Sequence, residues 1–266
     1  MSRPYATARD LRAACRRQEL TGPTTGLIAG FEQANLVIVP KEFAFDFLLF
    51  CRRNPRPCPL LDVTDPGDPE PKATAPGADL RTDLPRYRVW RDGRMVAEPT
   101  DITDLWRPDF VSFLIGCSFT FEHALMAAGV PVRHLEQGRN VPMFNTSVAC
   151  QPAGRFAGPL VVSMRPMTPA QAETAATICE RFPNSHGGPF HVGNPAAIGI
   201  ADINKPDYGD AVDIRPGEQP VFWACGVTPQ AALMTAKLPQ AITHAPGHMF
   251  LTDVRAERGH ATIKNI

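Results

Sequence analysis

The stretch that most constrains the fold of this chain runs from Phe110 to Cys150, where a strand-like segment leads directly into a helix-like segment and then into polar residues. Residues Phe110–Ile115 are mostly apolar and end at a glycine, which is typical of a buried strand. Residues Phe121–Ala128 are rich in alanine and end at Gly129, which predicts a helix. We therefore expect an α/β protein whose functional site lies at the turn between these two elements.

The turn carries several reactive side chains at close spacing, namely Cys117, Ser118, Thr120, Glu122 and His123. Ser118 or Thr120 can cap the helix, and Glu122 falls in its first turn. The free N–H groups and the dipole of such a helix attract an anion or stabilise a developing oxyanion. An alternative stays open, in which the hydroxyls only cap, Glu122 only complements the dipole and Cys117 is a small core residue.

Charge and length limit the class of protein. The 266 residues carry 27 basic and 27 acidic side chains, so the formal net charge is zero. Nucleic acids and anionic membranes are recognised by an excess of basic side chains, so neither is expected as a partner. A small amino or carboxylic acid is the expected partner, and the sequence is compatible with a homo-oligomer.

The seven cysteines are dispersed and form no CxxC pair, which argues against a disulfide framework and against a zinc site. Several lie in apolar surroundings, as the reduced cysteines of cytosolic proteins do. The first residues lack the apolar segment of a signal peptide, and no run of about 18 apolar residues occurs. We expect a cytoplasmic protein with no cofactor, and nothing in the sequence supports a divalent metal.

The remaining elements follow from apolar patterns and turn residues. We predict an opening helix to about residue 20, a strand at 36–39, a core helix at 41–51, a loop at 65–78, a hairpin at 87–97, a strand at 160–164, a helix at 169–180, a strand at 221–226 and a helix at 228–237. Residues 151–154 indicate a boundary. The predicted main α/β domain comprises residues 1–152 and 220–266, with a smaller α/β domain inserted at 153–219. No internal repeat is apparent.

Two histidines and a polar segment offer further candidates. His244 and His248 have a spacing that would bind zinc from a helix, but Pro246 and Gly247 between them make a helix improbable, so we expect them to face a pocket instead. Polar residues gather after the predicted helix: Arg133, His134, Glu136, Gln137, Arg139, Asn140, Asn145, Thr146 and Ser147. Loops at the carboxyl edge of an α/β sheet often bind ligands. The alternative is a solvated connection between domains.

Known nucleotide and hydrolase motifs do not fit. The chain has no GxxxxGK[ST] run and no GxGxxG run. The turn at 116–120 resembles half of a GxSxG nucleophile elbow but lacks the second glycine, which argues against a serine hydrolase.

Several segments together resemble the D-glutamate cyclase family, whose bacterial members are commonly labelled hydro-lyases. They are FLIGCSFTFE at 113–122, RNVPMFNT at 139–146, QANL at 33–36, DLPRY at 83–87, HGGP at 186–189, GVTPQ at 226–230 and HAPGHM at 244–249. The resemblance covers nearly the whole chain. Two positions depart from the pattern: Ile28-Ala29-Gly30 stands where Ala-Pro-Gly is expected, and Asn194 where Asp is expected.

The resemblance implies an α/β fold with a larger three-layer α/β/α domain and a smaller two-layer one. It also implies a carbon–oxygen lyase that dehydrates D-glutamate to 5-oxo-D-proline. Two alternatives remain: a lyase or hydratase for another carboxylic acid, and a protein that binds a small carboxylate without turning it over. A covalent Cys117 enzyme is a weaker alternative.

A mechanism for this reaction needs one acid–base pair and an oxyanion site. We assign the oxyanion site to the N–H groups around Cys117 and Ser118, and proton exchange to Glu122, His123 or His248. Arg139 and Asn145 are expected to hold the α-carboxylate. Thr120, Asn140, Thr146, Asn35 and His244 complete the predicted substrate-binding set. Glu122 could act as an acid only if burial raised its pKa.

Overall fold

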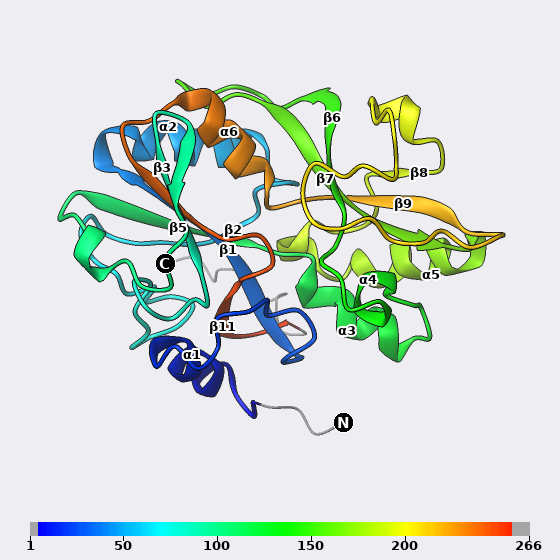
Figure 1. The fold of residues 1–266 in the computed structure, drawn as a ribbon, viewed down its shortest axis with the longest axis horizontal. Helices are drawn as coiled ribbons and strands as arrows, with labels where there is room; N and C mark the ends of the chain where they lie inside the picture. Colours follow the sequence, from blue (N-terminus) through cyan, green and yellow to red (C-terminus); the bar gives the residue numbers. More distant parts are fainter. Residues whose placement is uncertain (1–4, 257–266) are drawn as a thin grey trace.

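The computed structural model describes residues 5–256, which form a mixed α/β fold built on two sheets (Figure 1). Its helices are α1 (Ala8–Arg16), α2 (Lys41–Arg53), α3 (Phe119–Ala127), α4 (Arg133–Glu136), α5 (Pro169–Cys179) and α6 (Thr228–Ala236). Its strands are β1 (Phe31–Pro40), β2 (Leu60–Val63), β3 (Tyr87–Arg91), β4 (Arg94–Ala97), β5 (Phe110–Gly116), β6 (Met143–Ala149), β7 (Pro159–Met167), β8 (His191–Val192), β9 (Gln219–Ala224), β10 (Ala241–His244) and β11 (Phe250–Arg255).

The larger sheet has the strand order β2-β5-β1-β10-β3-β4, with β11 also pairing with β1, and the smaller sheet has the order β6-β7-β9-β8. Every strand pair among the described residues is antiparallel. The expectation that ligands bind at the carboxyl edge of a parallel sheet therefore does not apply. The functional site has to be located from side chains.

Apolar side chains arrange the helices in layers around the two sheets. Residues of α2 and α6 share one core with inward-facing residues of both sheets, such as Phe113 and Phe222, so these helices lie between the sheets. Helices α3 and α5 pack on the other face of the smaller sheet, around Trp223 (Figure 1). Residues 75–84 cover the outer face of the larger sheet. The two sheets thus share a continuous core at their junction.

Several predicted elements are confirmed, and some boundaries differ. The hairpin turns at Asp92 and Gly93, which both have positive φ, and residues 65–78 contain neither helix nor strand. Strand β1 begins at Phe31, five residues before the predicted start, because its first half buries polar residues that break the apolar pattern. The first helix ends at Arg16, not near Leu20.

Two expectations about helices are wrong in detail. Helix α3 begins at Phe119, so Ser118 is its N-cap residue and Thr120 lies inside the first turn; the Ser118 side chain makes no capping bond. Helix α2 is not entirely a core helix, since its Phe45 side chain is 73% exposed.

The smaller sheet is formed by residues 143–224. An inserted domain at 153–219 and the division into three layers and two layers stay predictions. None of the helices in residues 5–256 has both the length and the apolar character that crossing a bilayer requires.

Candidate functional site

Glu122 lies at the centre of a buried ionic cluster at the start of α3. Arg165, in the middle of β7, donates to Glu122 Oε1 from Nη2 at 2.5 Å and from Nε at 3.1 Å. The same guanidinium donates to the hydroxyls of Ser118 at 3.0 Å and Ser163 at 3.1 Å. His134 Nε2 lies 3.2 Å from Glu122 Oε1, at ion-pair distance but without the alignment of a hydrogen bond. The cluster ties β7 to the corner between β5 and α3.

The charge state of Glu122 follows from this environment. Burial raises the pKa of Glu122, but the nearby charges of His134 and Arg165 and the hydrogen bonds from Arg165 outweigh it and lower the pKa to about 2. At neutral pH the side chain is therefore a carboxylate with no proton to donate. The sequence analysis allowed Glu122 to act as an acid only if burial raised its pKa. The pKa is lowered instead, so this condition is not met.

The lowered pKa predicts a pH-dependent stability. A carboxyl whose pKa falls on folding stabilises the folded state above its ordinary pKa of 4.5, and this contribution is lost as the pH falls toward about 2. We expect the free energy of unfolding to fall by about 3 kcal/mol through this group between pH 5 and pH 2. Urea unfolding at a series of pH values tests this. The difference in the free energy of unfolding between wild type and Glu122→Gln should become smaller between pH 5 and pH 2. A constant difference would contradict the lowered pKa of Glu122.

The other side chains of the predicted corner have structural partners. Thr120 accepts a hydrogen bond from the backbone N–H of Gln33 at 2.9 Å. Cys117 is buried, and burial raises the pKa of its thiol. A thiol that stays protonated at neutral pH is a weak nucleophile, which disfavours the covalent Cys117 mechanism. Of the roles considered as the alternative, the core role fits Cys117, whereas Ser118 makes no capping bond, Thr120 bonds to β1 and Glu122 pairs with Arg165.

Three further predicted site residues use their side chains in contacts with the backbone. Asn35 donates to the carbonyl oxygens of Ile115 and Gly116 at 3.2 and 2.9 Å. His244 is buried beside the backbone of Leu36, and burial lowers its pKa to about 3. The Nδ1 of His123 bonds to the carbonyl oxygen of Thr120 at 2.8 Å.

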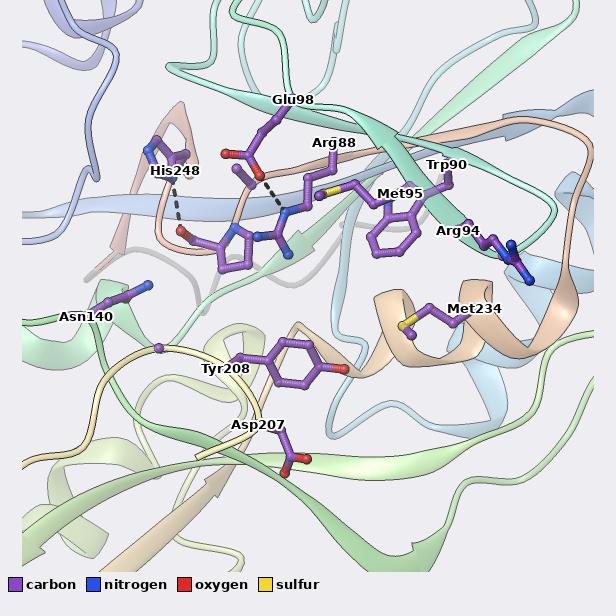
Figure 2. Close-up of a pocket in the computed structure, with 14 residues that line it drawn as sticks. Arg88, Trp90, Arg94, Met95, Glu98, Asn140, Asp207, Tyr208, Met234 and His248 are labelled. Carbon is purple, nitrogen blue, oxygen red and sulfur yellow. Dashed lines mark hydrogen bonds and ion pairs between the residues drawn. The ribbon is translucent and has the colours of Figure 1, made fainter. Parts of the chain in front are cut away.

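A cavity of about 720 Å³ lies between the β3–β4–β10 side of the larger sheet, α6 and the loop around Tyr208 (Figure 2). His248 and Asn140 are the two predicted site residues that line it. The other lining residues are Arg88, Trp90, Gly93, Arg94, Met95, Glu98, Asp207, Tyr208, Gly209, Met234, Ala245 and Pro246. Figure 2 shows Arg88, Glu98 and His248 grouped on one side, with Tyr208 and Asp207 on the other.

The cavity contains a neutral histidine and paired charges. The Nδ1 of His248 bonds to the carbonyl oxygen of Pro246 at 2.9 Å. Since a carbonyl can only accept, Nδ1 carries the proton and Nε2 has a free lone pair. Burial lowers the pKa of His248, so the ring is neutral at neutral pH. Arg88 Nε donates to Glu98 Oε2 at 2.9 Å. Burial raises the pKa of Tyr208, which keeps its hydroxyl a donor.

The rest of the predicted polar segment does not gather in one place. Arg139 is exposed and donates to the carbonyl oxygen of Ala211 at 2.6 Å. Thr146 donates to the carbonyl oxygen of Leu160 at 2.8 Å. The side-chain oxygen of Asn145 is buried without a partner. Arg139 precedes β6, whereas Asn145 and Thr146 lie in it, and Arg139 and Thr146 bond to different backbone carbonyls.

Sequence reasoning missed Arg165, Arg88, Glu98 and Tyr208. Arg165 interrupts an otherwise apolar strand, Leu160 to Met167, and a charged residue in such a run was the available signal for a buried partner. The cavity residues come from distant parts of the chain, so no local pattern pointed to them. Within residues 5–256 no three His, Cys, Asp or Glu side chains come close enough to hold a metal ion.

Comparison with known proteins adds the family. The sequence profile of the D-glutamate cyclase family matches residues 111–253. The chain belongs to the D-glutamate cyclase family. A Bacillus licheniformis protein named "Putative hydro-lyase" is 62% identical over 249 residues, which are 94% of this chain and 95% of that one. A protein of the same name from Stutzerimonas stutzeri is 60% identical over 93% of this chain and 94% of its own.

A third relative, a Bacillus subtilis protein named "Putative hydro-lyase YcsI", is 57% identical over 94% of this chain and 97% of its own. The resemblance inferred from the sequence motifs is confirmed. The names of the D-glutamate cyclase family relatives support the lyase class that the sequence predicted.

Proposed function

We propose that this member of the D-glutamate cyclase family is a carbon–oxygen lyase that dehydrates D-glutamate to 5-oxo-D-proline in the cavity beside His248. The observation that carries the proposal is the neutral imidazole of His248, whose free Nε2 is available to a ligand in a cavity lined by Arg88, Arg94, Glu98 and Asp207. Two carboxylates and one ammonium of glutamate match cationic and anionic side chains in one cavity.

The ring closure requires that nitrogen lose two protons and that one γ-carboxyl oxygen gain two. We assign the first proton transfer to His248 Nε2, which frees the amine lone pair to attack the γ-carboxyl carbon. The C–N bond forms, His248 also passes the second nitrogen proton to the γ-carboxyl oxygen that leaves, and the C–O bond breaks as water departs. The imidazolium of His248 returns the first proton to the same oxygen, and we assign Tyr208, which lines the same cavity, as the hydrogen-bond donor to it.

Arg88 takes the place of Arg139 as the group that holds a substrate carboxylate. Arg88 lines the cavity and pairs with Glu98, whereas Arg139 donates to the carbonyl oxygen of Ala211 outside it. A bidentate guanidinium–carboxylate contact would fix the orientation of the substrate. Glu122 and Arg165 then hold the α3 corner in place and do not exchange protons.

The test is incubation of the purified protein with D-glutamate, L-glutamate and related dicarboxylates, with and without divalent metal, followed by chiral detection of 5-oxoproline. Selective formation of the D product is the expected result. Turnover of another carboxylic acid alone would assign a different lyase substrate. Binding of carboxylates without any product would favour the non-catalytic alternative.

A further inference from the structure

The corner between β9 and α6 repeats the corner between β5 and α3. Residues 117–126 read CSFTFEHALM and residues 225–234 read CGVTPQAALM, so Cys, Thr and Ala-Leu-Met recur at the same spacing and Glu122 corresponds to Gln230. No internal repeat was apparent from the sequence, because only five residues agree over this stretch. The structure shows that the agreement is not accidental.

The backbone and its hydrogen bonds repeat as well. Both helices span nine residues, and both have an N-cap residue in the right-handed helical region with no side-chain cap bond. The hydroxyl of Thr120 accepts the N–H of Gln33 in β1 at 2.9 Å, and the hydroxyl of Thr228 accepts the N–H of Val161 in β7 at 3.0 Å. Gly116 pairs with Ala34 and Ala224 pairs with Val162, which is the same register in both sheets.

The order of strands extends the repeat to both sheets. The series β2-β5-β1-β10 of the larger sheet corresponds to β8-β9-β7-β6 of the smaller one. Strand β6 follows α3 yet pairs with β7 of the smaller sheet, and β10 follows α6 yet pairs with β1 of the larger sheet. The two halves therefore exchange elements through their corners, as expected for two copies related by an approximate two-fold axis.

The two corners meet at this junction. Cys117 and Cys225 belong to one cluster of buried residues, against which Tyr208 packs. The Asn35 side chain, bonded to the carbonyl of Gly116, also lies against Gly226, where an added Cβ would come 1.9 Å from Asn35 Nδ2. Because Tyr208 also lines the cavity, the corners lie behind the wall of the cavity.

The corner between β9 and α6 contains buried polar atoms without a hydrogen-bond partner, whereas Glu122 in the corner between β5 and α3 is paired. Glu122 is paired with Arg165, but the position in β1 that corresponds to Arg165 is Val37, so the Glu122–Arg165 ion pair has no counterpart at Gln230. Gln230 is buried and uses its Nε2 on the carbonyl oxygen of His244 at 3.1 Å. Its Oε1 and the Nε2 of His244 are buried without a partner. Buried polar atoms are normally paired, so these two indicate a ligand.

We propose that the two corners form one binding site for a small α-amino carboxylic acid or its lactam. The α-carboxylate of the ligand lies where the N-termini of α3 and α6 meet, and a ligand N–H donates to Gln230 Oε1. The second carboxylate of an open-chain ligand then extends toward Arg88 in the adjoining cavity. The unpaired N–H groups and dipoles of two helices favour a carboxylate there. This site deepens the proposed function. Only the identity of the ligand rests on that proposed function.

The test measures binding of 5-oxo-D-proline and glutarate to the full-length protein by calorimetry. Glutarate has carboxylates but no N–H group. Removing one hydrogen bond from a buried group costs about 1–2 kcal/mol, so Gln230→Leu should weaken 5-oxo-D-proline about tenfold or more and leave glutarate within about twofold. Gln230→Glu, which keeps the size, should weaken both ligands by charge repulsion. The control is Gln151→Glu, which adds the same charge at an exposed position.

Thermal unfolding shows whether each variant remains folded. Unchanged binding of 5-oxo-D-proline in both Gln230 variants would overturn the site, as would a wild type that binds neither ligand. Turnover of D-glutamate is measured separately. If the Gln230 variants bind as expected but D-glutamate is not turned over, the binding site stands and the substrate assignment is wrong. If D-glutamate is turned over but the Gln230 variants bind 5-oxo-D-proline as the wild type does, the binding site is wrong and the proposed function stands.

Discussion

Replacing Glu122 with Gln is expected to lower the free energy of unfolding by about 3–5 kcal/mol, because it leaves the guanidinium of Arg165 buried without a counter-charge. Arg165 is fully buried, and its hydrogen bonds are to Glu122 and to the hydroxyls of Ser118 and Ser163. Its guanidinium also lies over the rings of Phe121 and Trp223, 5.4 Å from each centroid. Hydroxyls alone do not compensate a buried cation. Urea unfolding at pH 7 measures the loss.

A double variant separates this pairing from a simple packing defect. Glu122→Leu with Arg165→Met removes both charges and keeps similar volume, so it should be more stable than Glu122→Gln alone, as for other buried ion pairs replaced together. A cost below about 1 kcal/mol for Glu122→Gln would contradict the buried pair. Loss of turnover in Glu122→Gln with no loss of stability would instead return Glu122 to the proton-transfer role that the sequence suggested.

Replacing His248 with Gln is expected to lower kcat by about 10²- to 10⁴-fold, the usual contribution of a general base. The half-buried ring makes its hydrogen bond within its own turn, to Pro246, so the free energy of unfolding should change little. KM should change less than kcat, since the carboxylates are held by other groups. Steady-state kinetics on D-glutamate, with circular dichroism to check the fold, measures both.

The matched control is His191→Gln, because His191 also bonds a nearby carbonyl, that of Asn194, but lies on β8 away from the cavity. Its kcat should stay within about twofold of wild type. Equal losses in both variants would point to a general effect of histidine removal, and unchanged turnover in His248→Gln would remove His248 from the mechanism.

Local sequence patterns predicted the elements that depend on neighbouring residues. The strand predicted at 110–115, the helix predicted at 169–180 and the hairpin predicted at 87–97 each formed, since a strand, a helix start and a turn need only local chemistry. The apolar pattern did not predict the first half of β1, because the polar residues Glu32, Gln33 and Asn35 are buried there. Their partners, such as Ser185 and Gly116, lie far along the chain and cannot be seen in a local window.

The candidate site was predicted in part. His248 and Asn140 line the cavity, and Cys117, Ser118 and Glu122 do lie together at one corner. The charge state of Glu122 was not predictable, because it depends on Arg165, which is 43 positions away. Arg88, Glu98 and Tyr208 were also out of reach, since they come to one cavity with His248 only where the larger sheet, α6 and the loop around Tyr208 meet.

The sequence by itself determined the family, the strand–turn–helix corner and its reactive side chains, because these are properties of contiguous residues and of their spacing. Only the tertiary structure decided which side chains are charged, which lack a hydrogen-bond partner and which line the cavity. Burial and partners set those properties, and both depend on residues that the fold brings together from distant parts of the chain. For the same reason the two corners could be recognised as one repeated element only when the exchange of β6 and β10 between the sheets placed them at a common junction.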